Sequence, residues 1–167
     1  MTLTELMTGK TPSSSFEGFV TADDFVLAVD CSEDGAAEVS AYAVVQVGVA
    51  GLDAQLNPTT QDKQYIRAGQ STIKTGNQRS FAVSGDRYEG DTFQDFALSH
   101  AIKYGTGNAV VRKYVYFCLL NGVGEQGKVS IIVNSDGSGN AGDSAEIDIE
   151  LRKSGDAPTT YTYSAAS

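Results

Sequence analysis

The sequence lacks tryptophan altogether and has only one histidine, two cysteines and three prolines among its 167 residues. A single histidine excludes most triads that need an imidazole base, and it excludes metal sites built from several histidines. Cys31 and Cys118 have no Cys-x-x-Cys or metal-type spacing, so we expect reduced, partly buried thiols rather than a disulfide. No apolar run is long enough to cross a membrane, and Met1–Ser15 lacks the apolar core of a signal peptide. We therefore expect the chain to stay in a cytosol until it assembles or is released.

Basic residues are also scarce. Lys and Arg together number 12 against 21 Asp and Glu, which gives a formal net charge of -9. Proteins that grip nucleic acid do so with Lys and Arg side chains that neutralise phosphates. The charge therefore argues against attractive binding of nucleic acid, but it leaves open a protein that encloses nucleic acid passively.

The glycine-rich stretch Asn134–Asp143 lacks the residues of two common loop sites. It contains no Gly-Lys-Ser/Thr and no helix is expected after it, which excludes a phosphate-binding loop. Read as an EF-hand loop from Asp136, it has Ala141 in place of the turn glycine and Ile147 in place of the bidentate acid. A looser metal site that uses Asp136 and Asp143 stays open as an alternative. No spacing suggests Ser/Lys or paired-carboxylate catalysis, so we expect neither a cofactor nor an enzyme.

The sequence does contain a strongly alternating segment, 145–151, which follows an apolar strand expected at 128–133 and the glycine-rich loop. One set of alternate side chains is apolar: Ala145, Ile147, Ile149 and Leu151. The other set is acidic: Glu146, Asp148 and Glu150. This period of two predicts a strand with one buried and one solvated face, on which the carboxylates are spaced roughly 7 Å apart. The acidic face is either the solvated side of an acidic protein or a wall past which a polyanion slides.

Other strands are expected along the chain, and the longest is 38–49, where apolar and mixed side chains alternate. Twelve residues would extend roughly 40 Å, so we expect this strand to run on into a projecting hairpin. The polar connection 51–69 shows no evident structure, and such connections are functional or mobile. Further strands are expected at 25–29, 71–75, 79–83, 108–120 (central, because both faces are apolar) and 159–163.

One helix is expected at 91–104, with Asp91 or Thr92 as its cap and Gly105 at its end. Its apolar stripe consists of Phe93, Phe96, Ala97, His100, Ala101 and Tyr104, which recur at helical spacing. His100 lies on this stripe without a second histidine nearby, so we expect a histidine packed in the core. We expect an N-terminal arm at 1–20, a β domain at 21–158 and a tail at 159–167; the arm is either disordered or docked on a neighbouring copy.

The order of these elements resembles that of the major tail tube proteins of long-tailed bacteriophages. The resemblance covers 38–158 and rests on turn and patterning residues. These are the valine-rich segment and long loop, Thr75-Gly76, Arg79-Ser-Phe81, Gly90-Asp91, Gly127-Lys-Val129, Gly139-Asn-Ala-Gly-Asp143, Glu146–Leu151 and Gly155-Asp-Ala-Pro158.

The resemblance implies a mainly β fold: a β-sandwich or partly open barrel of two packed sheets, one flanking helix and a long projecting hairpin loop. It implies that six copies form a ring and that rings stack into a tube through which the genome leaves the capsid. The implied partners are further copies of the chain, tail tip or baseplate, tape measure and tail terminator proteins, and viral DNA that passes without specific binding. The implied location is the virion, and the host cytoplasm during assembly.

Two sets of residues are expected to carry this function. Glu146, Asp148 and Glu150 are expected to face the lumen, because an acidic lining repels phosphates. The contact between rings and subunits is expected to involve Leu52, Asp53, Gln55, Asn57, Pro58, Gln61, Lys63 and Tyr65, in a loop that becomes ordered on assembly. The alternatives are another β-rich particle component (a capsid decoration or tail completion protein), a carbohydrate-binding module with Tyr161 and Tyr163 exposed, and an enzyme.

Overall fold

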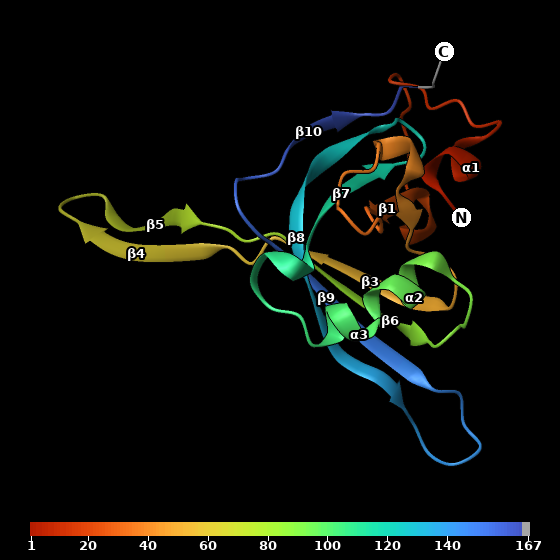
Figure 1. Ribbon diagram of the computed structural model, residues 1–167. Coiled ribbons are helices and arrows are strands. Elements are labelled where there is room, and N and C mark those ends of the chain that lie inside the picture. Colours follow the sequence, from red (N-terminus) through yellow and green to blue (C-terminus); the bar gives the residue numbers. More distant parts are fainter. Residues whose placement is uncertain (165–167) are drawn as a thin grey trace.

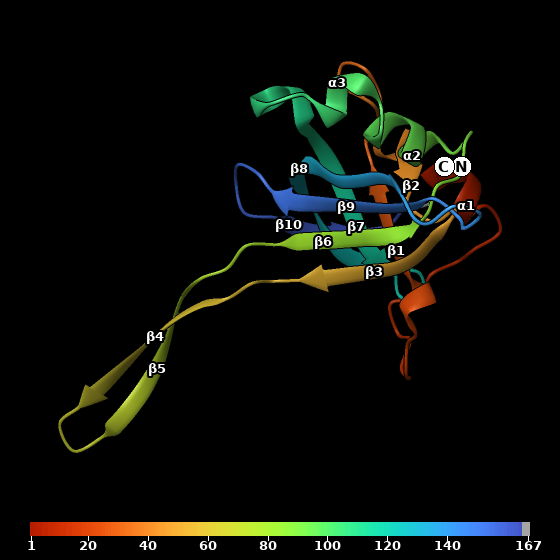
Figure 2. The same cartoon turned by 90° about the horizontal axis from the view of Figure 1, so that it is seen from below.

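The computed structural model describes residues 1–164, and in it one curled antiparallel sheet forms the body (Figure 1). Its strands, in chain order, are β1 Phe25–Val29, β2 Ala43–Val44, β3 Val49–Gln55, β6 Ser80–Asp86, β7 Val111–Cys118, β8 Val123–Ser138, β9 Glu146–Lys153 and β10 Thr159–Thr162. They are arranged in the order β2-β1-β7-β8-β9-β6-β3, and β10 pairs with the first part of β8. A second sheet consists of β4 Thr59–Tyr65 and β5 Gly69–Gly76 and projects from the body as a hairpin (Figure 2). The expected mainly β fold with a partly open barrel and a projecting hairpin is confirmed.

The helices are short. They are α1 Leu3–Met7, α2 Thr92–Ala97 and α3 His100–Lys103, with single 3₁₀ turns at Ala22–Asp24, Val39–Ala41 and Gly107–Val110. None of the helices in the described part of the chain is long and apolar enough to cross a membrane.

The main core lies on the concave side of the sheet, which we call the core face. Strands β6, β8 and β9 contribute alternate apolar side chains to it, and α2 and α3 cover it. Phe81, Val83, Ile149 and Leu151 are all fully buried there. Burial of aliphatic and aromatic side chains supplies most of the stability of such a domain, at roughly 1.5–3 kcal/mol for each large side chain.

A second core lies on the opposite side of the sheet, which we call the outer face. Val115 and Phe117 of β7 are buried there beneath Leu3 and Met7 of α1. Thr2 caps α1 through a capping box with Glu5, which satisfies free N–H groups at the helix start. Part of the expected N-terminal arm is therefore a helix that packs on the body of its own chain.

The prediction of one continuous strand at 38–49 is wrong. Only Ala43–Val44 and the last residue, Val49, which begins β3, pair as strand residues, and Val39–Ala41 form a 3₁₀ turn. The alternation itself is real over four residues, because Tyr42 and Val44 face the second core while Ala43 and Val45 face the main core. Gly48 then adopts a left-handed φ of 73°, which turns the chain into β3.

The prediction that 51–69 has no regular structure is also wrong, since this segment contains most of β3 and all of β4. Similarly, the loop expected at 134–143 is shorter, because β8 continues to Ser138. The strands expected at 25–29, 71–75, 79–83 and 159–163 are confirmed by β1, β5, β6 and β10. The central position of β7, between β1 and β8, is confirmed as well.

The helix expected at 91–104 is broken into α2 and α3. Asp91 caps α2 as expected, but Ser99 is extended and starts α3 afresh. Phe93 and Ala97 are buried and Phe96 packs against the main core, whereas His100, Ala101 and Tyr104 are exposed. The expectation of a core histidine is therefore wrong, and Ile102 takes the buried place in α3.

Candidate functional site

The alternation in β9 places its acidic side chains on the outer face. Ile147, Ile149 and Leu151 are buried in the main core, Glu146 and Asp148 are exposed, and Glu150 is half-buried. Ala145 lies just before the strand and is exposed, so it does not belong to the apolar set. The predicted alternation is thus confirmed within the strand itself.

The neighbouring strands extend this acidic surface with small and polar residues. On β6, Ala82, Ser84 and Asp86 pair with Glu150, Asp148 and Glu146. On β8, Ile132, Ser135 and Ser138 pair with the same three residues. On the edge strand β3, Asp53 pairs with Ala82. We call this surface of β3, β6, β9 and the end of β8 the open half of the outer face (Figure 2).

Negative charge dominates the open half. Its acidic residues are Asp53, Asp86, Glu146, Asp148 and Glu150. The exception is Arg152, whose guanidinium lies 3.0 Å from the carboxylate of Glu150. Asp86 and Glu146 are direct cross-strand partners, an arrangement of like charges that disfavours the folded state. A face that needed only solubility would not require such a pair.

The other part of the outer face, along β1 and β7, is covered, and we call it the covered half. α1 lies over it from one side, and the rings of Tyr161 and Tyr163 pack on Phe117 with centroids 5.5 and 6.0 Å away. Tyr161 and Tyr163 are therefore half-buried packing residues and not the exposed pair that a carbohydrate platform would need.

The residues predicted for contact between copies are distributed over the hairpin and its base. Leu52 packs against the main core and Asp53 lies on the open half. Gln61, Lys63 and Tyr65 share one face of the hairpin, and every residue of β4 is exposed. Gln55, Asn57 and Pro58 belong to the base of the hairpin.

The base of the hairpin is held by two polar side chains. Asn57 has a φ of 46°, and its amide nitrogen donates to the carbonyl of Gln78 at 3.0 Å and to the hydroxyl of Ser80 at 2.7 Å. Arg79 pairs with Glu125 at 2.6 Å, and its guanidinium lies over the rings of Phe81 and Tyr116. Sequence reasoning missed Arg79, because its partner is 46 positions away in the chain and no local pattern links them.

Solved structures share this arrangement of strands. A chain from the tail of an empty gene transfer agent particle, refined with helical C6 symmetry, superimposes with a TM-score of 0.59 and 16% identity, covering 87% of this chain and 100% of the other. A chain from the virion of a native gene transfer agent particle has a TM-score of 0.57 and 15% identity, covering 86% of this chain and 100% of the other. The chain has the fold of these two particle components.

A third solved structure, the tube-terminating cap of the anti-feeding prophage, superimposes with a TM-score of 0.51 and 11% identity, covering 89% of this chain and 95% of the cap chain. No protein-family model matches the chain, and no curated protein matches it in sequence. At these identities the comparisons establish the fold and no more.

The described residues offer neither a cluster of metal ligands nor a reactive thiol. Within residues 1–164, no three His, Cys, Asp or Glu side chains are placed to hold a metal ion, and Asp136 instead pairs with Lys103 at 2.9 Å. Both cysteines are free. Burial, together with the negative charge of Asp30, raises the pKa of the Cys31 thiol to about 12, so at neutral pH it is a poor nucleophile.

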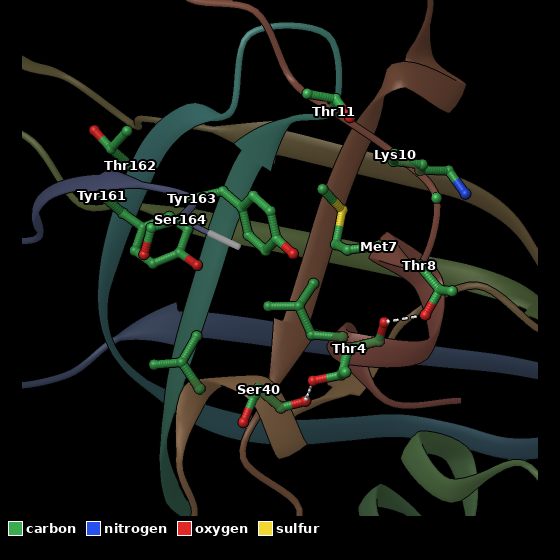
Figure 3. A pocket seen from close by; sticks show the side chains of 13 residues that line it. Thr4, Met7, Thr8, Lys10, Thr11, Ser40, Tyr161, Thr162, Tyr163 and Ser164 are labelled. Carbon is green, nitrogen blue, oxygen red and sulfur yellow. Dashed lines mark hydrogen bonds between the residues drawn. The ribbon is translucent and has the colours of Figure 1, made fainter. Parts of the chain in front are cut away.

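A groove of about 580 Å³ runs between α1 and the end of β10 (Figure 3). Two of its hydroxyls are already bonded: Thr4 donates to the carbonyl of Ser40 and Thr8 to the carbonyl of Thr4, both at 2.9 Å. Lys10 is the only ionisable side chain among its described lining residues apart from the phenols of Tyr161 and Tyr163. The groove therefore offers packing surface and no acid–base pair.

Proposed function

We propose that this chain is the subunit of a tail tube, in which six copies close into a ring and stacked rings conduct DNA out of a particle. The single observation that carries this proposal is the bare, acidic open half of the outer face on a fold shared with a tail of C6 symmetry. The proposed location is the virion, with assembly in the host cytoplasm. The proposed partners at the ends and in the lumen are tail tip or baseplate, terminator and tape measure proteins.

In the proposed tube, Glu146, Asp148 and Glu150 line the lumen. Their charges would repel the phosphates of DNA over about 8–10 Å, the screening length at ordinary salt. A basic groove binds DNA by releasing the counterions that surround it, and an acidic wall offers no such gain. DNA would therefore slide through the channel without being held.

The edges of the sheet support self-association. Within residues 1–164, β3 pairs only with β6, so one of its sides presents backbone N–H and C=O groups that a second chain can pair with. A closed ring satisfies such edges by symmetry, and a contact that does not close continues into a stack.

The first test is negative-stain electron microscopy of the concentrated protein, with size-exclusion chromatography at low concentration. We expect tubes or stacked rings with a central hole. A monomer at every concentration, even with purified tail tips added as a template, would contradict the proposal.

The lumen assignment has a test of its own. The variant Glu146→Lys/Asp148→Lys/Glu150→Lys is compared with Glu33→Lys/Glu38→Lys/Asp156→Lys, which makes the same charge change at residues away from the open half. We expect tubes of the first variant to retain DNA on sedimentation, and tubes of the wild type and of the second variant to release it. Equal retention by both variants would place the three acids outside the lumen.

A second candidate is a protein that forms a single terminating ring, which the likeness to the tube-terminating cap favours. The number of rings that join into one stack distinguishes the two functions. A terminator would give isolated rings at all concentrations and would bind the end of a preformed tube, whereas a tube subunit would give stacks whose length grows with concentration.

A further inference from the structure

In the described part of the chain the curled sheet does not close, and a groove of about 320 Å³, lined by both apolar and polar residues, marks the gap between its two ends. We call it the seam groove. Apart from alanine, seven apolar side chains from α1, β1, the segment after β2, β3 and the segment after β7 line it: Leu6, Phe25, Val26, Val45, Val49, Leu52 and Leu119. Val26 and Val45 are buried, but the other five are only partly buried, so the groove leaves apolar surface uncovered in the single chain. It also borders β3, the edge strand.

The one charged side chain among the described lining residues of the seam groove is acidic. Asp23 lines it and is exposed, and no Lys or Arg is found among its described lining residues. A partner that fits this groove must therefore combine an apolar side chain with a positive charge beside it, since like charges across an interface weaken binding.

The turn of the β4–β5 hairpin has this chemistry. Ile66 is 88% exposed and Tyr65 is 45% exposed, and Arg67 follows at once. The hairpin as a whole carries Lys63, Arg67 and Lys74 against a single acid, in a chain of net charge -9. An isolated two-stranded hairpin with both faces in water is marginally stable at best, so packing on another surface would stabilise it.

A second exposed apolar segment competes as the occupant. In Phe16–Val20, Phe19 is fully exposed. However, this segment contains Glu17 and no basic residue, so it would bring negative charge to Asp23. Charge therefore favours the hairpin turn.

The occupant must come from a second copy. The hairpin leaves the body where β3 ends at Gln55, and the seam groove lies where β3 begins at Val49. β3 alone spans roughly 20 Å, and the hairpin extends away from it (Figure 2). A protrusion at one end and a receptor at the other make a head-to-tail contact, which repeats without closing.

We propose that the seam groove of one copy receives the hairpin turn of a second copy, with Ile66 inserted among the apolar side chains and Arg67 beside Asp23. This inference rests on the proposed function and deepens it, because it names the two surfaces through which successive rings join.

The first experiment is a charge exchange in the full-length protein. We expect Arg67→Asp and Asp23→Arg each to raise the concentration needed for polymerisation about tenfold, and the double variant to return it towards the wild-type value. Lys74→Asp, at the base of the hairpin, makes the same charge change as Arg67→Asp and is expected to have little effect. Normal polymerisation of both single variants would overturn the proposal.

The second experiment does not require tubes. Protein with Ile66→Cys is mixed with protein with Ala50→Cys, since Ala50 is an exposed residue of the seam groove. We expect a disulfide between the two chains on mild oxidation, and none when Thr72→Cys replaces Ile66→Cys.

The two experiments together separate this inference from the proposed function. If tubes form but the disulfide does not, the docking proposal is refuted and the proposed tube function is retained. The disulfide without tubes, under conditions that include a tail-tip template, would leave the docking and overturn the tube. Absence of both would overturn both.

Discussion

The two halves of the outer face belong to one sheet but differ in what lies over them. Along β1 and β7, α1, Tyr161 of β10 and Tyr163 just after it bury Phe117 and its neighbours. Along β3, β6 and β9, nothing in the described part of the chain covers Glu146 and Asp148, and the side chains are acidic or small. The covered half contributes to stability through packing, whereas the open half adds little and is free to serve an assembly.

The largest loss of stability is expected from a substitution in the covered half. Phe117 is fully buried there, and Phe117→Ala should lower the free energy of unfolding of the monomer by about 3–5 kcal/mol. Ile132→Ala, on the open half where the side chain is 37% exposed, should cost less than about 1 kcal/mol. Urea denaturation measures both, and equal losses would remove the distinction between the halves.

The next largest loss of stability is expected when a buried side chain of α1, which covers this half, is shortened. Leu3 is 1% exposed, so Leu3→Ala should lower the free energy of unfolding by about 2–3 kcal/mol. Thr4→Ser on the exposed side of the same helix is the matched control, because it keeps the hydroxyl that donates to the carbonyl of Ser40, and the expected change is about 0.5 kcal/mol or less. If Leu3→Ala were as mild as its control, α1 would not hold the cover in place.

Alkaline pH should weaken the packing of the covered half. Burial is the main cause that raises the pKa of Tyr42 from 10.0 to about 12, and burial also raises the pKa of Tyr161. Because the unfolded chain loses these protons first, the stabilisation is complete below pH 10 and is lost as pH rises towards 12.

Urea denaturation across this pH range checks the alkaline prediction, and Tyr42→Phe should flatten the dependence. A steeper loss of stability in Tyr42→Phe than in the wild type would contradict it.

The smallest effect is expected on the open half. Glu146→Gln/Asp148→Asn should change the free energy of unfolding of the monomer by no more than about 0.5 kcal/mol. At low salt the sign should be stabilising, because the cross-strand repulsion between Asp86 and Glu146 is removed. A loss above about 2 kcal/mol would show that these carboxylates are structural.

Sequence patterns predicted the elements whose cause is local. In β9 the period of two follows from the strand itself, since neighbouring side chains point to opposite faces. The N-cap of α2 at Asp91 was predictable for the same reason, because a cap involves only residues of the first turn.

The errors arose where distant segments decide the structure. The alternation at 38–49 is as regular as that of β9, but in this range only Ala43–Val44 and Val49, the first residue of β3, find a partner strand. The backbone N–H of Leu3 donates to the carbonyl of Tyr42, so the N-terminus is bonded where the predicted strand would have continued. In the predicted helix the helical spacing of apolar residues continues through His100, but the extended conformation of Ser99 ends the first helix before it.

Gln94 is a further case that the sequence did not reveal. It is fully buried in α2, and its amide donates to the carbonyls of Val47 and Asp86 while it accepts from the N–H of Tyr88. A glutamine in a helix usually indicates an exposed site, and only the tertiary structure supplies these three partners.

The sequence by itself determined that β9 has an apolar and an acidic side, because that alternation is a property of consecutive residues. Only the tertiary structure decided that the acidic side stays bare, since the cover is made by α1 and by the two tyrosines in and just after β10, at opposite ends of the chain. Both cover β7 and leave β9 open, because the apolar side chains that they bury on the outer face are those of β1, β2 and β7.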